Sequence, residues 1–203
     1  MSGFADHLAR LFAEGHKAPI PDLLSDAAFA RDGRRTPAAV LIAVTDVADN
    51  PQVILTQRPN TMRDHPGQVA FPGGKIDPGE DAITAALREA EEELALPPAA
   101  VRVIGASDDY VTGTGFIVTP VVGVVPPGLE LVPSPSEVAA IFEAPLAMLL
   151  DRRQWRSNEV FWRGANRSYL EMEYQGFRIW GVTAAILANL ARRIALEKLH
   201  DVA

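Results

Sequence analysis

The chain has 203 residues, 48% of them hydrophobic, and a formal net charge of −7. This length and apolar content predict one folded unit with a substantial buried core. The acidic balance argues against bulk binding to nucleic acid or anionic membrane, because proteins bind those polyanions through Lys and Arg. The chain contains no cysteine, which excludes disulfides and thiolate metal sites but leaves carboxylate sites for hard cations open.

Residues 1–34 are predicted to form a helical extension that packs on a core beginning near Arg35. A helix is expected over residues 3–15, because its apolar side chains recur on one helical face. A short helix in the twenties and a polar turn at 32–35 should follow. The segment lacks the apolar core of a signal peptide, and no stretch approaches the roughly 18 apolar residues of a transmembrane helix. A soluble, cytoplasmic protein is therefore expected.

The core is predicted to consist mainly of strands, with one helix inserted early and another at the end. The first two strands, expected at 38–45 and 52–58, should form a hairpin, and a short strand at 69–71 should precede a turn at 72–74. Further strands are expected at 101–110 and 116–125. A strand followed by a short helix is expected within 136–150, and two or three strands within 155–180. Pro120 suggests an edge position or a bulge for its strand. Helices are expected at 82–95 and, as an amphipathic element, at 182–197. The pattern predicts an α+β fold in which helices cover both faces of a mixed sheet, over residues 35–203.

The stretch GGKIDPGEDAITAALREAEEEL, residues 73–94, gathers four glutamates at the end of its helix. Like charges three or four residues apart repel one another, and the helix macrodipole opposes carboxylates near the C-terminus. At about 100° per residue, Glu89, Glu92 and Glu93 fall on one face, whereas Glu91 points away. Most glutamate runs are simply solvated, but Mg²⁺ or Mn²⁺ would turn this repulsion into attraction. We therefore expect these three carboxylates to converge on a divalent cation.

Two short segments precede this helix and determine how the chain enters it. Gly73 and Gly74 allow a close backbone approach, so that a main-chain carbonyl can face the same ion. Pro78 and Gly79 turn the chain, and Asp81 is a suitable N-cap for the helix.

The spacing of these residues resembles the Nudix box, which runs Gly, five residues, Glu, seven residues, Arg-Glu, an aliphatic, any residue, Glu-Glu, any residue, Gly and an aliphatic. Every charged position matches, and the matching residues are Gly74, Glu80, Arg88, Glu89, Glu92 and Glu93. Ala90 stands where the box has a bulkier aliphatic residue, and Ala95 replaces the final glycine. A glycine there would take a left-handed helix end, which alanine adopts at a cost of about 1 kcal/mol.

A second resemblance lies upstream, in ILTQRPNTMRDHPGQVAFPGG. It is similar to the signature of the coenzyme A pyrophosphatase branch of the Nudix hydrolases, although Pro59 departs from it. The matching residues are Leu55, Thr56, Arg58, Arg63, Gly67, Phe71, Pro72, Gly73 and Gly74. The two motifs together span residues 54–96.

The resemblance implies an α/β/α sandwich that hydrolyses a nucleoside diphosphate derivative with the help of Mg²⁺ or Mn²⁺. It implies the following roles: Glu92 and Glu93 as main metal ligands, Glu89 as a ligand or general base, Gly74 as a carbonyl ligand, Arg88 as the group that holds a carboxylate in place, and Glu80 as an auxiliary residue. Some family members take the base from a distant acid instead, for which Glu137 and Glu143 are the candidates here.

The branch resemblance implies that coenzyme A or acyl-coenzyme A is split into adenosine 3′,5′-bisphosphate and (acyl-)4′-phosphopantetheine. Arg58 and Arg63 are expected to contact the anionic groups, with His65 and Lys75 nearby. An apolar groove for the pantetheine arm could draw on Phe116, Phe161 and Trp162. The alternatives are a Nudix pyrophosphatase for ADP-ribose, NADH or a nucleoside triphosphate, and a Nudix-like binding module without turnover. The expected partner is a small molecule rather than nucleic acid or membrane, and the sequence permits a homodimer.

Overall fold

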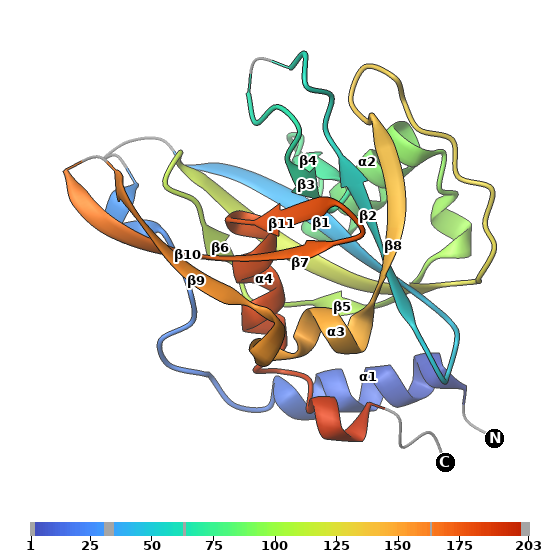
Figure 1. The fold of residues 1–203 in the computed structure, drawn as a ribbon. Helices are drawn as coiled ribbons and strands as arrows, with labels where there is room; N and C mark the ends of the chain where they lie inside the picture. The colour runs from blue at the N-terminus through green and yellow to red at the C-terminus, as the bar shows by residue number, and fades with distance from the viewer. Residues whose placement is uncertain (1–2, 31–34, 63, 163, 200–203) are drawn as a thin grey trace.

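The computed structural model describes residues 3–30, 35–62, 64–162 and 164–199, and a mixed eight-stranded sheet forms the centre of this part (Figure 1). The path of the sheet is β3-β2-β1-β7-β5, with β4 paired to β1, β6 to β7 and β8 to β2. These strands are β1 (Thr36–Thr45), β2 (Gln52–Gln57), β3 (Val69–Ala70), β4 (Gly73–Lys75), β5 (Arg102–Ala106), β6 (Tyr110–Val111), β7 (Phe116–Val125) and β8 (Ala140–Pro145).

The parallel pair of β1 and β7 is the backbone of the sheet, in continuous register from Thr36 opposite Phe116 to Thr45 opposite Val125. Both strands are runs of small and β-branched apolar residues, which suit a strand that is buried on both faces. The predicted hairpin is confirmed, because β1 and β2 pair antiparallel with Val44 opposite Val53. Sequence periodicity thus identified the strands, but only the tertiary structure shows that β7 joins β1.

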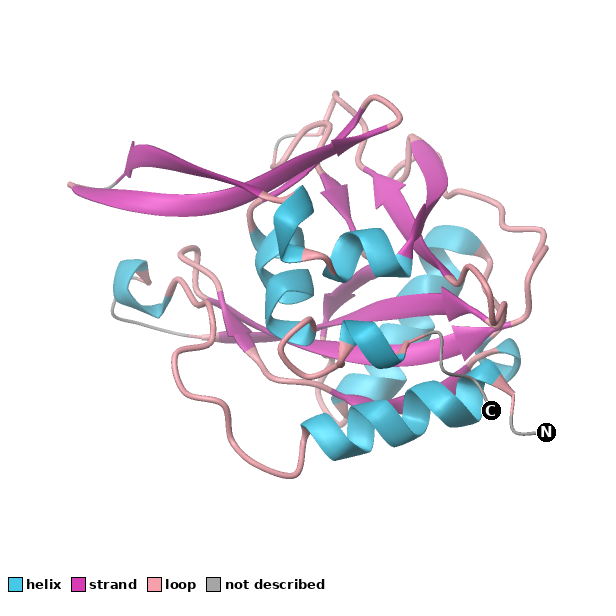
Figure 2. Ribbon diagram, turned by 60° about the horizontal axis from the view of Figure 1, so that its bottom comes forward, coloured by secondary structure: helices cyan, strands magenta, loops and turns pink. Residues whose placement is uncertain are grey.

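Helices cover both faces of this sheet, so the predicted α/β/α sandwich is confirmed (Figure 2). On one face, α2 (Ala82–Leu94) packs against the alternate side chains Ala39, Leu41 and Ala43 of β1. On the other face, Ile42 and Val44 of β1 share a core with α1 (Phe4–Gly15), α3 (Leu146–Leu150) and α4 (Val182–Leu190). Among the described residues, no helix is long and apolar enough to cross a membrane.

Four single turns of 3₁₀-helix complete the main body. They are η1 (Ala27–Phe29), η2 (Pro98–Ala100), η3 (Arg152–Gln154) and η4 (Leu196–Lys198). The first of them is the short helix expected in the twenties. The turn expected at 32–35 falls largely on residues 31–34, outside the part of the chain that the structure describes.

The predicted N-terminal helix is α1, and it lies beside the C-terminal segment (Figure 1). Its Phe12 ring packs directly on Gly105 of β5, where an added Cβ would lie 2.9 Å from the ring atom Cε1. His7 Nε2 donates to the carbonyl oxygen of Lys198 at 2.7 Å. Burial of its apolar face stabilises this helix, since a single short helix is marginal in water. The boundary near residue 35 between extension and domain stays a prediction.

A separate three-stranded antiparallel sheet, in the order β11-β10-β9, accounts for the strands predicted within 155–180. Its strands are β9 (Arg156–Trp162), β10 (Ala165–Tyr174) and β11 (Phe177–Trp180). Two contacts join it and α4 to the main sheet. Phe142 of β8 and Phe177 of β11 stack with ring centroids 3.9 Å apart, and the buried Thr183 hydroxyl of α4 donates to the Val69 carbonyl at 2.9 Å.

Four predictions about these elements need correction. The segment at 101–110 is two strands, β5 and β6, rather than one, and residues 73–75 form strand β4 instead of a turn. The last helix ends at Leu190 and is buried along nearly its whole surface, so it is not amphipathic. Pro120 lies in the interior strand β7, not at an edge. It is tolerated because it sits opposite the break between β5 and β6, where only its carbonyl is used, as acceptor from Ser107 N–H at 2.8 Å.

Helix α2 begins and ends close to the predicted residues. The Asp81 side chain caps it by accepting from Thr84 N–H at 2.8 Å. At the other end, Ala95 has φ 54° and ψ 30°, the left-handed conformation that glycine adopts at low cost.

We predict that Ala95→Gly raises the free energy of unfolding by about 1 kcal/mol, because it relieves this left-handed strain. Ala95 is exposed, so no core packing is lost. Urea unfolding of the wild type and the variant measures the difference. The exposed helical position Glu91 provides a control, since Glu91→Gly should destabilise by about 1 kcal/mol. A loss of stability in Ala95→Gly would contradict the expectation.

Candidate active site

A cleft of about 570 Å³ opens beside β4, the strand that precedes α2. One side of it is formed by Arg58, His65, Gly74 and Lys75, four of the residues predicted to bind metal or substrate. Its opposite side includes Phe116 of β7 and Ile186 of α4. The structure therefore brings the upstream signature and the Gly-Gly segment to one concave surface. Arg63, the other arginine predicted to bind substrate, lies outside the described residues.

Arg88 organises the acidic face of α2. Its Nε and Nη2 atoms donate to the two carboxylate oxygens of Glu80 at 2.9 and 3.1 Å. Its Nη1 atom donates to Glu89 Oε1 at 3.0 Å and to Glu92 Oε1 at 3.3 Å, and Nη2 also reaches the Lys75 carbonyl at 3.1 Å. One planar guanidinium thus ties the loop before the helix to two acids on the helix.

Glu93 is the buried acid of the site, with only 5% of its surface exposed. One carboxylate oxygen accepts from Gly73 N–H at 3.3 Å. Burial raises the pKa of Glu93 to about 8, and repulsion from Glu137 and Glu89 adds to the shift. The Gly73 N–H and the positive charge of Arg58 act in the opposite direction but do not offset the burial.

Glu89 lies directly against the Gly-Gly segment. A Cβ added at Gly74 would sit 2.4 Å from its carboxylate carbon, so a side chain there would push the Glu89 carboxylate away from the strand. Burial raises the pKa of Glu89, with repulsion from Glu92 and Glu137 in the same direction, while Arg88 opposes the shift. The Gly-Gly segment therefore adjoins two carboxylates of α2, and the role of the Gly74 carbonyl as a metal ligand stays a prediction.

The expected convergence of three carboxylates is not formed. Among the described residues, no three His, Cys, Asp or Glu side chains are gathered closely enough to hold a metal. In this arrangement the Nη1 atom of Arg88 binds both Glu89 and the largely exposed Glu92, while Glu93 turns inward to Gly73. The residues nonetheless fit a divalent cation chemically. Glu89 and Glu93 are hard oxygen donors whose pKa values are both raised by burial, and the charge of Glu89 adds to the shift of Glu93, a situation that a bound cation would reverse.

Glu137 belongs to this acidic group, since its charge raises the pKa of both Glu89 and Glu93. The loop that carries it is fastened to the end of α2, because Ser134 N–H donates to the Glu93 carbonyl at 2.8 Å and Val132 N–H to the Leu94 carbonyl at 2.9 Å. Glu143, the other candidate for a distant base, lies exposed on β8 opposite Ile54. Of the two, Glu137 is the acid whose charge acts on Glu89 and Glu93.

Several residues of the cleft were not anticipated from the sequence. Thr112, Val182 and Ile186 line it from segments far along the chain, where no local motif marks them.

Of the three aromatics expected to form an apolar groove, only Phe116 lines the cleft. Phe161 is 73% exposed, and Trp162 packs on Phe29. Both lie on the β9–β10 hairpin, which extends away from α2 (Figure 1).

Comparison with known proteins identifies the family. The family model described as "NUDIX domain" matches residues 35–162, more than half of the chain. The chain belongs to the Nudix hydrolase family. This Nudix chain is 45% identical over 161 residues to a protein of Escherichia coli strain K12 named "Uncharacterized Nudix hydrolase NudL", a match that covers 79% of this chain and 83% of the relative. A NudL of the same description from Enterobacter sp. strain 638 is 44% identical over 164 residues, with 80% and 85% covered.

A solved structure supports the fold. The Nudix hydrolase RenU from M. smegmatis superimposes with a TM-score of 0.55 at 22% sequence identity, over 84% of this chain and 92% of RenU. At this identity the likeness concerns the fold alone. It agrees with the α+β architecture of a mixed sheet flanked by helices.

The raised pKa of Glu93 predicts a pH dependence of stability in the metal-free protein. The unfolded carboxyl ionises near pH 4.5 and the folded one near pH 8, so the unfolded state binds fewer protons between these values. The free energy of unfolding should therefore fall as pH rises from about 4.5 to about 8. The contribution is fully present below this window and lost above it.

Urea unfolding in EDTA at pH 5, 7 and 9 measures this effect. Relative to the wild type, Glu93→Gln should gain roughly 2–5 kcal/mol between pH 5 and pH 9. Glu91→Gln, at an exposed position of the same helix, is the matched control and should follow the wild-type curve. Parallel curves for the wild type and Glu93→Gln would rule out a titrating buried Glu93.

Proposed function

We propose that this Nudix hydrolase cleaves the diphosphate bond of coenzyme A or acyl-coenzyme A. The products would be adenosine 3′,5′-bisphosphate and (acyl-)4′-phosphopantetheine. One observation carries the proposal: Arg58, His65 and Lys75 line the same cleft as Gly73 and Gly74, against which the acids of α2 lie. The residues of the coenzyme A signature thus adjoin the candidate hydrolytic site, as a substrate with several phosphates requires.

The acids of α2 are proposed to hold one or more divalent cations. Glu93, Glu89 and Glu92 would supply carboxylate oxygens, and Gly74 would supply its carbonyl. Mg²⁺ or Mn²⁺, when bound, neutralises phosphate oxygens and makes the phosphorus more susceptible to attack by water. Glu92 would have to leave Arg88 for this, which costs little because the pair is only loosely joined at 3.3 Å and largely exposed.

Arg88 is proposed as a positioning residue. Its paired bonds to Glu80, and its single bond to Glu89, fix the helix against the loop before it whether or not Glu92 is engaged. Glu80 is then auxiliary, because it anchors this guanidinium and also accepts from Asp77 N–H at 3.0 Å.

Arg58 is proposed to contact the diphosphate. Its positive charge already acts on Glu93, and its Nε atom is buried without a hydrogen-bond partner among the residues that the structure describes. A buried guanidinium N–H without an acceptor is costly, and a phosphate oxygen would satisfy it. His65 and Lys75, which are exposed on the rim of the cleft, are the proposed contacts of the 3′-phosphate, together with Arg63.

Glu137 is proposed as the general base that accepts the proton of the attacking water. We predict that Glu137→Gln lowers kcat at least 100-fold, a barrier increase of about 2.7 kcal/mol, with a smaller effect on KM. Glu143→Gln is the matched control, because it makes the same change on the neighbouring strand, and its kcat should stay within about threefold of the wild type. The opposite ranking of the two variants would assign the base to Glu143, and unchanged rates in both would leave Glu89 as the base.

A substrate panel with Mg²⁺ or Mn²⁺ tests the function itself. It contains coenzyme A, acyl-coenzyme A, dephospho-coenzyme A, NADH, ADP-ribose and nucleoside triphosphates, with the products identified by mass. The expected result is the highest kcat/KM on coenzyme A or its thioesters, and at least tenfold less on dephospho-coenzyme A, because a contact to the 3′-phosphate contributes about 1.4 kcal/mol or more.

Other results would point elsewhere. Equal rates on coenzyme A and dephospho-coenzyme A would exclude the 3′-phosphate contact. Higher rates on ADP-ribose, NADH or a nucleoside triphosphate would favour the alternative Nudix activity. No turnover of any substrate would leave a binding module.

A further inference from the structure

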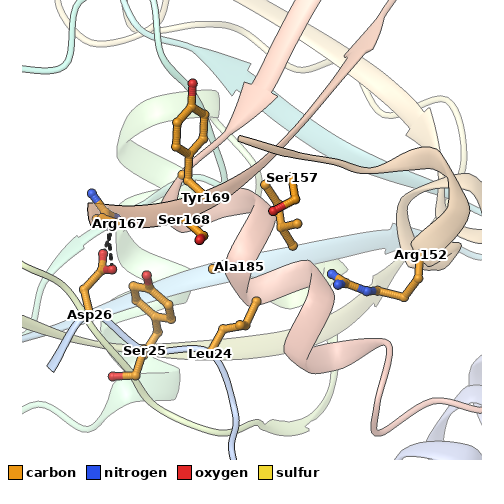
Figure 3. Close-up of a pocket in the computed structure, with 12 residues that line it drawn as sticks. Leu24, Ser25, Asp26, Arg152, Ser157, Arg167, Ser168, Tyr169 and Ala185 are labelled. Carbon is orange, nitrogen blue, oxygen red and sulfur yellow. Dashed lines mark hydrogen bonds and ion pairs between the residues drawn. The ribbon is translucent and has the colours of Figure 1, made fainter. Parts of the chain in front are cut away.

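A second cavity, of about 190 Å³, lies outside the cleft (Figure 3). It is enclosed by residues 24–26 of the N-terminal segment, by β9 and β10, and by the start of α4. Tyr110 and Gly181 line this cavity, whereas Thr112 and Val182, close to them in the chain, line the cleft. Strand β6 and the first turn of α4 therefore separate the two spaces, and none of the proposed catalytic residues lines the second one.

One wall of the cavity carries a self-contained ion pair. Arg167 Nε donates to Asp26 Oδ1 at 2.8 Å, and its Nη2 pairs with Asp26 Oδ2 (Figure 3). The Tyr110 hydroxyl interacts with both groups, and burial together with the Asp26 charge raises its pKa. Both charged side chains are largely buried and cancel each other. This wall consequently offers polarity but no net charge to a ligand.

The facing wall carries a positive charge that remains uncompensated. Arg152, on η3, extends its guanidinium toward the cavity (Figure 3). In the part of the chain that the structure describes, no carboxylate pairs with it, because the adjacent Asp151 is taken by Arg153 at 2.9 Å. Asp26 and Arg167 on the opposite wall neutralise each other, so Arg152 leaves the lining of the cavity with one net positive charge. A ligand with one negative charge would balance it.

The rest of the lining is mixed. Leu24, Leu170 and Ala185 provide apolar surface, and Ser157 and Ser168 provide hydroxyl groups. An arginine fork is matched in geometry by a carboxylate, and a single positive charge suits this monoanion better than a phosphate dianion. A cavity of about 150 Å³ accommodates benzene, so about 190 Å³ has room for a ring of that size with a carboxylate attached.

We propose that this cavity is a binding site for a small organic monocarboxylate. The carboxylate pairs with the Arg152 guanidinium, and the apolar body of the ligand lies against Leu24, Leu170 and Ala185. The site is independent of the proposed hydrolysis, because it shares no lining residue with the cleft.

Benzoate is the probe, titrated into the full-length, isotope-labelled protein and followed by amide and methyl NMR shifts. The expected result is saturation with a Kd at or below about 1 mM, a free energy of about −4 kcal/mol, and shifts centred on Leu24, Leu170 and Ala185. Benzamide, which has the same shape without the charge, should bind at least tenfold more weakly. Inorganic phosphate should compete no better than benzamide.

Two variants separate the specific contact from general electrostatics. Arg152→Gln should weaken benzoate binding at least tenfold. Arg153→Gln removes the same charge one residue away, on a side chain that is paired with Asp151 and lies outside the lining, and should leave the Kd unchanged. Both variants retain the buried Asp26–Arg167 pair and are on exposed positions, so they should fold as the wild type does.

Several outcomes would overturn the proposal. They are the lack of saturation up to roughly 10 mM benzoate, equal binding of benzamide, equal losses in the two arginine variants, and shifts centred on Phe116 and Ile186 in the cleft. Strong competition by phosphate would also overturn it, since it would make the site a general anion site rather than one for a carboxylate.

Discussion

The buried carboxylate of Glu93 is the constraint on which the rest of the site depends. The side chain has one hydrogen bond, from Gly73 N–H at 3.3 Å, and its burial makes the ionised form expensive, which raises its pKa to about 8. A protein that keeps such a group needs a positive charge close to it whenever it ionises. Arg58 supplies part of that charge from within the chain. A divalent cation held together with Glu89 would supply the remainder, which is why the same burial that destabilises the metal-free protein favours metal binding.

Two features of the neighbouring chain determine the geometry around the Glu93 carboxylate. The first is the Gly-Gly strand: a side chain at Gly73 would collide with the backbone of β1, and one at Gly74 would displace the Glu89 carboxylate. The second is Arg88, whose fork to Glu80 holds the loop and the helix in one arrangement. Together they hold the acids of α2 against the Gly-Gly strand, which itself lines the cleft. A divalent cation would then bind by displacing the weak pair of Arg88 with Glu92.

Segments from both ends of the chain build the other side of the molecule. Helix α1 and the C-terminal turn pack together, and α4 contributes to the cleft through Ile186 and to the second cavity through Ala185. The Asp26–Arg167 pair fastens the N-terminal segment to β10 across 141 positions of sequence. The N-terminal extension thus lines the second cavity, so that the candidate active site and the proposed carboxylate site share helix α4 while remaining separate spaces.

The sequence by itself determined the parts of this protein that depend on local interactions. The cap at Asp81, the left-handed end at Ala95 and the apolar face of α2 follow from a few neighbouring residues, and the matched spacing of the acids identified the family. The sequence did not reveal that Arg88 would bind both Glu89 and Glu92, because helical periodicity gives the direction of a side chain but not its partner. Nor did it reveal the cleft wall at Ile186 or the pair of Asp26 with Arg167. Those depend on which strands and segments meet, and only the packing of the whole chain decides that, since contacts between residues far apart in sequence leave no periodic signal in it.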